Sequence, residues 1–246
     1  MTPGKHCKSG VHSLEARLFW QISHNHHHPI MKTRHLLSLV PATMFIASCG
    51  NPADETESAT VTDAVEVAET DGIPVEGTVT YVLQPESEIN FVGSKVTGSH
   101  DGGFKAFTGS FTVADGQLAS GNHQVVIDMN SIWSDNDNLT AHLKNEDFFE
   151  VEKHPTSTFV LTGVEATDVE GEYRVSGNLT LIGNTRNITF PASASIDGET
   201  VSINAKFDIN RKDWEIVYAG RADDLIRDQV VVELKIIAAP ESTTEA

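Results

Sequence analysis

Apolar and polar residues alternate along three long segments in the C-terminal half of this chain. Within residues 187–196, 200–210 and 230–238, every second side chain is apolar, and polar side chains occupy many of the positions between them. Successive side chains of a β-strand point to opposite faces, so alternation over nine or more residues indicates antiparallel strands with one buried and one hydrated face. The chain is therefore expected to fold as an all-β protein.

Six weaker segments repeat this pattern, and turn sequences separate several of them. Dipeptides typical of tight turns occur at Asp115-Gly116, Glu170-Gly171 and Asp197-Gly198. The weaker segments are 78–83, 89–96, 106–113, 123–131, 157–164 and 172–181. Many short, evenly spaced strands favour a sandwich or a closed barrel, and closure removes the unpaired strand edges.

The segment between the fourth and fifth of these weaker strands departs from the alternation. Leu139, Leu143 and Phe148 recur there at roughly helical spacing. Asp135 or Asp137 would be a suitable N-terminal cap. We expect one or two short helices here, with a loop that packs against one end of the barrel.

An eight-stranded barrel encloses a space just large enough to be filled by its own side chains or to hold one ligand. The alternation places apolar side chains inside, so an occupant would be a hydrocarbon chain. Alternation does not distinguish an occupied lumen from a filled core, and both stay open on this pattern. The side chains expected to line the lumen are Val125, Ile127, Met129, Phe159, Leu161, Phe190, Ile203 and Phe207.

An export signal precedes the β-rich part. Lys32 and Arg34 are followed by a mostly apolar stretch over 36–47, which is too short to cross a bilayer but typical of a signal peptide. Ile-Ala-Ser directly before Cys49 resembles the lipobox of bacterial lipoproteins, which implies cleavage before Cys49 and lipidation of its thiol. The alternative is an ordinary secretory signal with an incidental cysteine. We predict a lipid-anchored periplasmic protein of the cell envelope, with the outer membrane favoured because no acidic residue directly follows Cys49.

These features divide the chain into five parts. Residues 1–30 are expected to be an upstream extension outside the mature protein, and 31–48 the lipoprotein signal peptide. Residues 49–77 are rich in carboxylates and lack aromatic and basic side chains, so we expect a disordered acidic tether. The barrel is expected over 78–239, followed by a flexible tail over 240–246.

Charge and motif content argue against several classes of function. A net charge of −18 disfavours contact with nucleic acid and with anionic lipid headgroups. The sequence has no Gly-x-Ser-x-Gly and no His-Glu-x-x-His motif. His100, His123, His142 and His154 are too scattered to indicate a metal set. We expect no catalysis, no metal and no cofactor, and membrane contact through the Cys49 lipid only.

Three segments resemble the YceI-like family. The stretch LTAHLKNEDFFEV over 139–151, closing on His154-Pro155, is similar to its signature of His-Leu, Asp-Phe-Phe and aromatic-Pro. Residues 177–186 resemble its Gly-x-Leu-Thr-x-x-Gly-x-Thr-Arg motif, and 109–111 its Gly-x-Phe. The resemblance spans about 78–239.

Members of that family are exported, lipocalin-like antiparallel barrels, and several bind polyisoprenoid chains along the barrel axis. The resemblance implies an eight-stranded barrel that binds, sequesters or transports a long-chain apolar lipid, polyisoprenoid or quinone-like. The chain departs from the family pattern at Glu86-Ser87-Glu88 and at Leu139-Thr140, which leaves the headgroup preference open. The rival hypothesis is an acidic structural or stress-related interaction lipoprotein with a filled core and no ligand. Whether the barrel forms a homodimer is also left open.

Four further residues are candidates for the barrel rim or for contact with a lipid headgroup. They are His142, Arg186, Trp214 and Tyr218. Arg186 could pair with a ligand phosphate, or with carbonyls and carboxylates of a turn. His142 could orient a headgroup or pin a loop. Trp214 and Tyr218 could stack on a lipid chain or belong to the core.

Overall fold

The computed structural model describes residues 50–67, 77–114, 117–118 and 123–241. The predictions for the upstream extension, the signal peptide, Cys49 and residues 242–246 fall outside these described residues. Within them, no helix is both long enough and apolar enough to cross a membrane.

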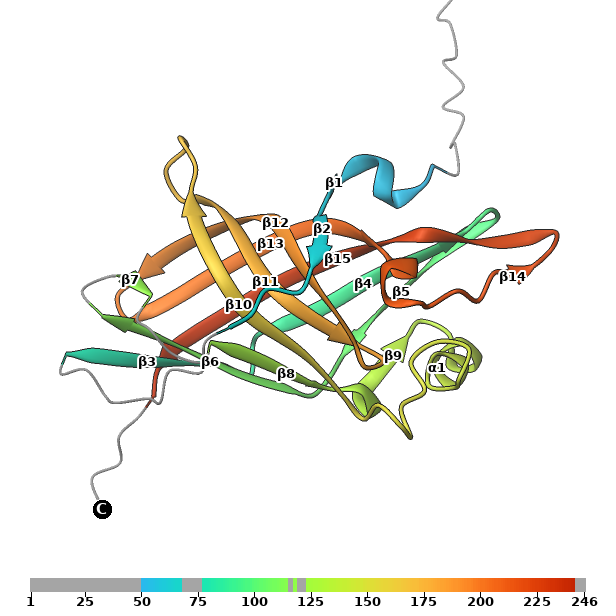
Figure 1. The fold of residues 1–246 in the computed structure, drawn as a ribbon, viewed down its shortest axis with the longest axis horizontal. Coiled ribbons are helices and arrows are strands. Elements are labelled where there is room, and N and C mark those ends of the chain that lie inside the picture. The colour runs from blue at the N-terminus through green and yellow to red at the C-terminus, as the bar shows by residue number, and fades with distance from the viewer. Residues whose placement is uncertain (1–49, 68–76, 115–116, 119–122, 242–246) are drawn as a thin grey trace, which may run out of the picture. The chain divides into compact units, whose positions relative to one another are not determined.

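Eight antiparallel strands close into a barrel, which confirms the predicted fold class (Figure 1). Closure is made by the last strand, because β15 pairs with β13 on one side and with β3 on the other. Ala238 lies opposite Val201 of β13 and opposite Leu83 of β3. In ring order the strands are β3 (Thr78–Leu83), β6 (Phe107–Ala114), β8 (Gln124–Asp128), β10 (Thr156–Ala166), β11 (Glu172–Leu181), β12 (Asn184–Asp197), β13 (Thr200–Asn210) and β15 (Asp224–Pro240).

Shorter strands lengthen the wall beyond this ring. β4 (Glu88–Lys95) continues the line of β3 along β15, β5 (Gly98–Phe104) leads into β6, and β9 (Ile132–Ser134) pairs with β5. β7 (Gln117–Leu118) pairs with β6, and β14 (Gly220–Arg221) pairs with the start of β15. The sequence did not predict β5, because its glycine-rich segment lacks alternation.

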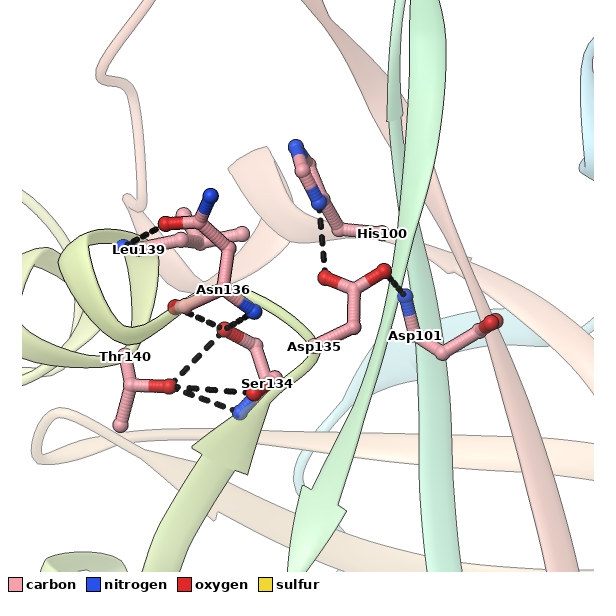
Figure 2. A network of polar contacts seen from close by, with 7 residues as sticks. All are labelled: His100, Asp101, Ser134, Asp135, Asn136, Leu139 and Thr140. Carbon is pink, nitrogen blue, oxygen red and sulfur yellow. Dashed lines mark hydrogen bonds and ion pairs between the residues drawn. The ribbon is translucent and has the colours of Figure 1, made fainter.

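The predicted helix is present as α1 (Asp137–Leu143), but its cap differs from the prediction. The Asn136 side chain accepts a hydrogen bond from the Leu139 backbone N–H at 3.0 Å. The expectation of Asp135 or Asp137 was wrong, because the Asp135 carboxylate is occupied by His100 Nδ1 at 2.7 Å and by the Asp101 N–H at 3.3 Å (Figure 2). This network ties the start of α1 to β5.

Three short 3-10 helices complete the elements of the described residues. They are η1 (Pro52–Glu55), η2 (Met129–Ser131) and η3 (Arg211–Trp214). η3 follows β13 directly, so Trp214 is placed at the end of the barrel where β13 ends. Arg211 is buried beside it, and its guanidinium donates to the carbonyl oxygens of Ile216 and Arg227. Burial lowers the pKa of Arg211.

The segment before the barrel is ordered where the structure describes it. Residues 51–65, which we call the strap, contain β1 (Glu57–Ser58), parallel to β13, and β2 (Thr60–Asp63), antiparallel to β12. The expectation of a disordered tether is therefore wrong for these residues. That expectation considered only the small apolar surface of the segment. The segment is ordered because it also supplies hydrogen-bond partners to backbone groups at strand edges.

The strap fills a gap in the barrel wall. β12 and β13 pair with each other only between Ser193–Asn204 and Asp197–Thr200. Farther along, β2 supplies the partner of β12 at residues 186–189, and β1 supplies the partner of β13 at 207–208. The strap thus completes the hydrogen bonding where the two strands diverge.

Candidate functional site

Three phenylalanine rings lie inside the barrel and form what we call the aromatic floor: Phe159, Phe190 and Phe207. The rings of Phe190 and Phe207 are stacked, with centroids 4.2 Å apart and planes within 13°. Phe159 lies against Phe190 at 5.9 Å with its ring tilted by 53°. Residue 177 must be glycine for this arrangement, because a Cβ there would overlap the Phe159 ring.

Burial of the inward side chains decreases from the aromatic floor toward one end of the barrel. On β12 the exposed fraction rises from 4% at Phe190 and 7% at Ala192 to 74% at Ile196. On β13, Phe207 and Ala205 are buried, whereas Ile203 is half-buried. We call this the open end, and it is formed by the β10–β11 and β12–β13 hairpins. The inward apolar side chains therefore become more exposed toward this end.

The opposite end is sealed by side chains from η3 and from the α1 region. Trp214 is fully buried, and its indole N–H donates to the Leu179 carbonyl oxygen at 2.9 Å. Ile216, Leu143 and Phe148 are buried in the same apolar cluster as the floor residues Phe190 and Phe207. This end, which we call the closed end, gives the lumen a base.

The eight residues predicted to line the lumen fall into two groups. Ile127, Met129, Phe190 and Phe207 are buried, whereas Val125, Phe159, Leu161 and Ile203 are half-buried. Seven of them belong to, or pack against, the two apolar clusters of the interior, and Leu161 is the exception. Leu161 pairs with Gly177, so it shares the face of the wall on which the floor lies. Their contact with a lipid remains a prediction.

Two further aromatic residues, which sequence analysis missed, face the interior. Tyr81 of β3 and Phe111 of β6 are cross-strand partners, and their rings stack at 5.3 Å with planes within 3°. Tyr81 also lies opposite Pro240, at the end of β15 that borders the open end. The alternation in both segments predicted the strands, but no local pattern shows that these two side chains meet.

Two of the four candidate rim residues lie together at the closed end. His142 Nε2 is 2.7 Å from an Asp147 carboxylate oxygen, and its ring meets Phe148 and Tyr218 edge-on, with centroids 5.0 Å away in each case. His142 therefore holds the loop after α1, which was the structural alternative. The Tyr218 ring also packs against Phe148 at 5.4 Å.

The other two candidates also have structural partners. Arg186 donates from Nε to the Asp213 carbonyl oxygen at 3.1 Å, and its Nη1 is 3.1 Å from an Asp63 carboxylate oxygen of the strap. Trp214 is part of the closed end. Neither residue lies on the hairpins of the open end.

Polar residues on the outer wall, which sequence analysis did not single out as functional, bind the strap. The buried carboxylate of Asp208 accepts hydrogen bonds from the hydroxyls of Thr56 and Ser58 at 2.9–3.0 Å. The Asn178 amide bonds both backbone groups of Val65, at 3.0 and 2.7 Å. Arg174 pairs with Glu57, which raises the pKa of Arg174. The strap also turns Ala59 and Val61 toward the interior cluster.

Two hollows on the outside of the wall do not suit a hydrocarbon chain. One borders the ion pairs Lys206–Glu233 and Lys235–Glu88. The other lies beside the strap and includes Asp63, Arg186 and Lys212 among its lining residues. Both are lined mostly by polar and charged side chains, so the apolar interior is the better candidate for a lipid.

Comparison with known proteins agrees with this architecture. Residues 81–238 match the YceI-like domain family. A UPF0312 protein of Pseudomonas putida strain W619 is 30% identical over 165 residues, which cover 62% of this chain and 84% of that protein. A UPF0312 protein of Pseudomonas aeruginosa strain PAO1 is 35% identical over 98 residues, covering 40% of this chain and 50% of that protein.

Two solved structures share the fold. Burkholderia cenocepacia BcnA superposes with a TM-score of 0.56 at 23% identity, over 63% of this chain and 97% of that one. A polyisoprenoid binding domain from Saccharophagus degradans, implicated in plant cell wall breakdown, superposes with a TM-score of 0.55 at 19% identity, over 66% of this chain and 99% of that one.

Proposed function

Because this chain belongs to the YceI-like family, we propose that its barrel binds the hydrocarbon chain of an isoprenoid-type lipid. The observation that carries the proposal is the burial gradient along the interior, from the aromatic floor to the open end. Apolar side chains that a filled core would bury completely are half-buried above the floor, as Leu161 and Ile203 show. The description of the Saccharophagus degradans domain as polyisoprenoid binding supports the same ligand class.

The length of the inward-facing wall between the floor and the open end suits a chain. Phe190 and Ile196 lie six positions apart on β12, which corresponds to about 20 Å along a strand. With strands tilted by about 40°, the depth along the axis is about 15 Å. Each methylene removed from water contributes roughly 0.8 kcal/mol, so a chain reaching the floor is bound by burial alone.

We propose binding, sequestration or transport, and not catalysis. Inward side chains between the floor and the open end include aliphatic ones, as Leu161 and Ile203 illustrate. Such side chains hold a hydrocarbon chain by contact but transfer no protons. The lipid would therefore leave the lumen chemically unchanged.

We place this activity in the cell envelope, with Cys49 as the lipid anchor. The strap supports a close attachment, because it is already fixed to the barrel at Asn51, whose side chain lies 3.4 Å from the Ser94 hydroxyl. Asn51 is only two positions from Cys49 in the sequence, a span of at most about 7 Å. An anchored barrel would thus lie near the membrane surface, with the outer membrane favoured.

The proposal is tested by native mass spectrometry of the full chain, expressed in bacteria and extracted gently. The full chain is needed because a barrel that starts at Thr78 lacks the strap. We expect an additional mass that solvent extraction removes and that added polyprenol restores. A protein whose mass is shifted by no polyprenol, quinone or fatty acid would contradict lipid binding.

One observation favours the rival function, an interaction lipoprotein with a filled core. The interior side chains pack into two apolar clusters, and the stacked pair Phe190–Phe207 occupies the middle of the larger one. If the same mass spectra show only the unliganded protein, the acidic outer surface becomes the better candidate for a partner contact.

A further inference from the structure

The strap is held more lightly than the strands on either side of it. β12 pairs with β11 along residues 184–193, and β13 pairs with β15 along residues 201–210. The strap pairs with β12 through residues 60–63 and with β13 through residues 57–58. The strap is therefore the part of the wall with the shortest backbone ladders to its neighbours.

Side chains of the wall add to this attachment. The ion pairs that Glu57 and Asp63 form with arginines lie at the surface, where such pairs contribute little. The stronger contacts are the hydrogen bonds from the strap to Asp208 and to Asn178. A segment held by a few hydrogen bonds can open while the rest of the barrel stays folded.

The strap lies between two strands that would otherwise pair. If the β12–β13 ladder continued in the same register, Thr189 would lie opposite Asp208. Instead, Thr189 lies opposite Thr60 of the strap, and Asp208 lies opposite Ser58. Paired strands are about 4.8 Å apart, so the two wall backbones are about 10 Å apart where the strap passes between them. We call this space between Thr189 and Asp208 the slot.

The slot reaches the interior at the level of the aromatic floor. The floor residue Phe207 lies opposite Glu57 of the strap. Ala59 and Val61 of the strap pack against the apolar cluster that contains Phe190 and Phe207. These two side chains close the interior where β12 and β13 are unpaired. The slot is thus a route to the floor that does not run through the open end.

We infer that the strap is a lateral gate, and that the lipid chain enters and leaves the lumen through the slot when the strap is released. This inference rests on the proposed lipid binding. Carbon atoms in contact are about 4 Å apart, so one hydrocarbon chain fits between two backbones about 10 Å apart. A gate of this kind sets the rates of loading and release and leaves the affinity at equilibrium unchanged.

A disulfide between the strap and the wall tests the gate. Thr60 and Thr189 are partners on antiparallel strands. The Cα atoms of such partners are about 4.5–5.5 Å apart, which a disulfide can span. The locked variant is Thr60→Cys/Thr189→Cys in the full chain, in a background where the two native cysteines are replaced, Cys7→Ala/Cys49→Ala.

The measured quantity is the rate of transfer of radiolabelled polyprenol between the protein and phosphatidylcholine vesicles, in both directions. In the oxidised locked variant we expect loading and release to slow by about tenfold or more, with the affinity of the background protein retained. Reduction with dithiothreitol should restore both rates. The control Glu172→Cys/Ser193→Cys joins β11 to β12 and leaves the strap free, so its oxidation should not change the rates.

A second variant makes the opposite change and needs no cross-link. Asp208→Ala removes the acceptor of the Thr56 and Ser58 hydroxyls, so the strap should open more often. Transfer should accelerate by about tenfold or more, the factor that corresponds to losing a hydrogen bond to a charged group. Asp197→Ala removes an exposed carboxylate elsewhere on β12 and should leave the rate unchanged.

The outcomes separate the gate from the function on which it rests. Unchanged transfer in the oxidised locked variant, with disulfide formation verified by thiol titration, would overturn the gate and leave lipid binding in place. Equal slowing in the β11–β12 control would also overturn it, because stiffening of the wall would then explain the effect. Transfer that Asp208→Ala does not accelerate would contradict the gate without any cross-link. If the background protein binds no polyprenol, the proposed function itself fails, and the gate falls with it.

Discussion

The ring of Phe159 lies directly against the α-carbon of Gly177, at a point where no side chain could fit between them. Gly177 belongs to β11, and its cross-strand partner on β10 is Leu161, two residues beyond Phe159. The absence of a side chain at Gly177 leaves room for the end of the Phe159 ring, which packs against Phe190. The position of the Phe159 ring thus depends on one glycine.

Replacing this glycine should disturb the aromatic floor. In Gly177→Ala the added methyl overlaps the Phe159 ring, which must leave its position, and we expect a loss of about 1–3 kcal/mol in the free energy of unfolding. Urea denaturation measures the loss. Gly163→Ala is the control, because a Cβ at Gly163 meets nothing within 4 Å. Equal effects of the two substitutions would mean that the contact with Phe159 does not constrain the wall.

Asp208 should hold the strap in place. Its carboxylate accepts from two strap hydroxyls, and its backbone carbonyl accepts from the Ala59 N–H at 2.8 Å. Hydrogen bonds to a charged group contribute about 1.5–3 kcal/mol each, so Asp208→Ala should release the strap before the barrel unfolds. Hydrogen exchange at residues 57–63 should accelerate strongly, with little change in β10 and β11. Asp197→Ala, at an exposed carboxylate, should leave that exchange as it is; a similar acceleration there would contradict the role of Asp208.

The strap marks the limit of what the sequence could show. Most of its residues are polar or acidic, and its order depends on the divergence of β12 from β13 beyond the Ser193–Asn204 pair, which no local pattern encodes. Its partners on the wall, Asp208 and Asn178, occupy outward positions of two predicted strands. On pattern alone they resemble ordinary surface residues.

The barrel itself could be predicted because alternation is a local property. The segment 200–210 was identified with the bounds that β13 has in the structure. The strand β5 was not predicted because glycine, which has no side chain, contributes nothing to an alternating pattern. Gly102 and Gly103 are needed in β5 because β4 and β9 approach closely there. The sequence could predict that Phe159, Phe190 and Phe207 face the interior. It could not predict that their rings pack together, because those contacts join different strands.

Acid should weaken the joint between the β4–β5 and β14–β15 hairpins. Lys95 Nζ lies 2.5 Å from an Asp224 carboxylate oxygen, and Lys95 with Thr97 holds the pKa of Asp224 below its usual value of 3.8. A lowered pKa stabilises the fold above that value and ceases to do so as the pH falls through the folded-state pKa. The difference in melting temperature between wild type and Asp224→Asn should therefore be constant near neutral pH and should decrease toward zero below pH 3.8. The control Asp223→Asn should show no such pH dependence, and a difference that widens in acid would contradict the assignment.

Removing the cysteine thiol should detach the protein from membranes. In Cys49→Ala no lipid can be attached at this position, so the protein should move from the membrane fraction to the soluble fraction. Lipid binding by the barrel should be unchanged, because the lumen residues are elsewhere. Mass spectrometry of the N-terminal peptide reports whether the wild-type thiol is acylated. A Cys49→Ala protein that stays with membranes would show that another feature holds it there.

A bulky side chain above the floor distinguishes an occupied lumen from a filled core. Leu161 is half-buried on the inner face of β10. If the lumen is open, Leu161→Trp should fit without much loss of stability and should block the lipid, lowering affinity by tenfold or more. If the core is filled, the same change overpacks it and costs about 1–3 kcal/mol of unfolding free energy. Ser195→Trp, at an exposed position whose cross-strand partner is Ser202, is the control for the added ring. Urea denaturation and polyprenol binding are measured on wild type and on both variants. If Leu161→Trp loses binding but keeps its stability, the result supports the lipid carrier. If Leu161→Trp loses stability, the result supports the interaction lipoprotein with a filled core.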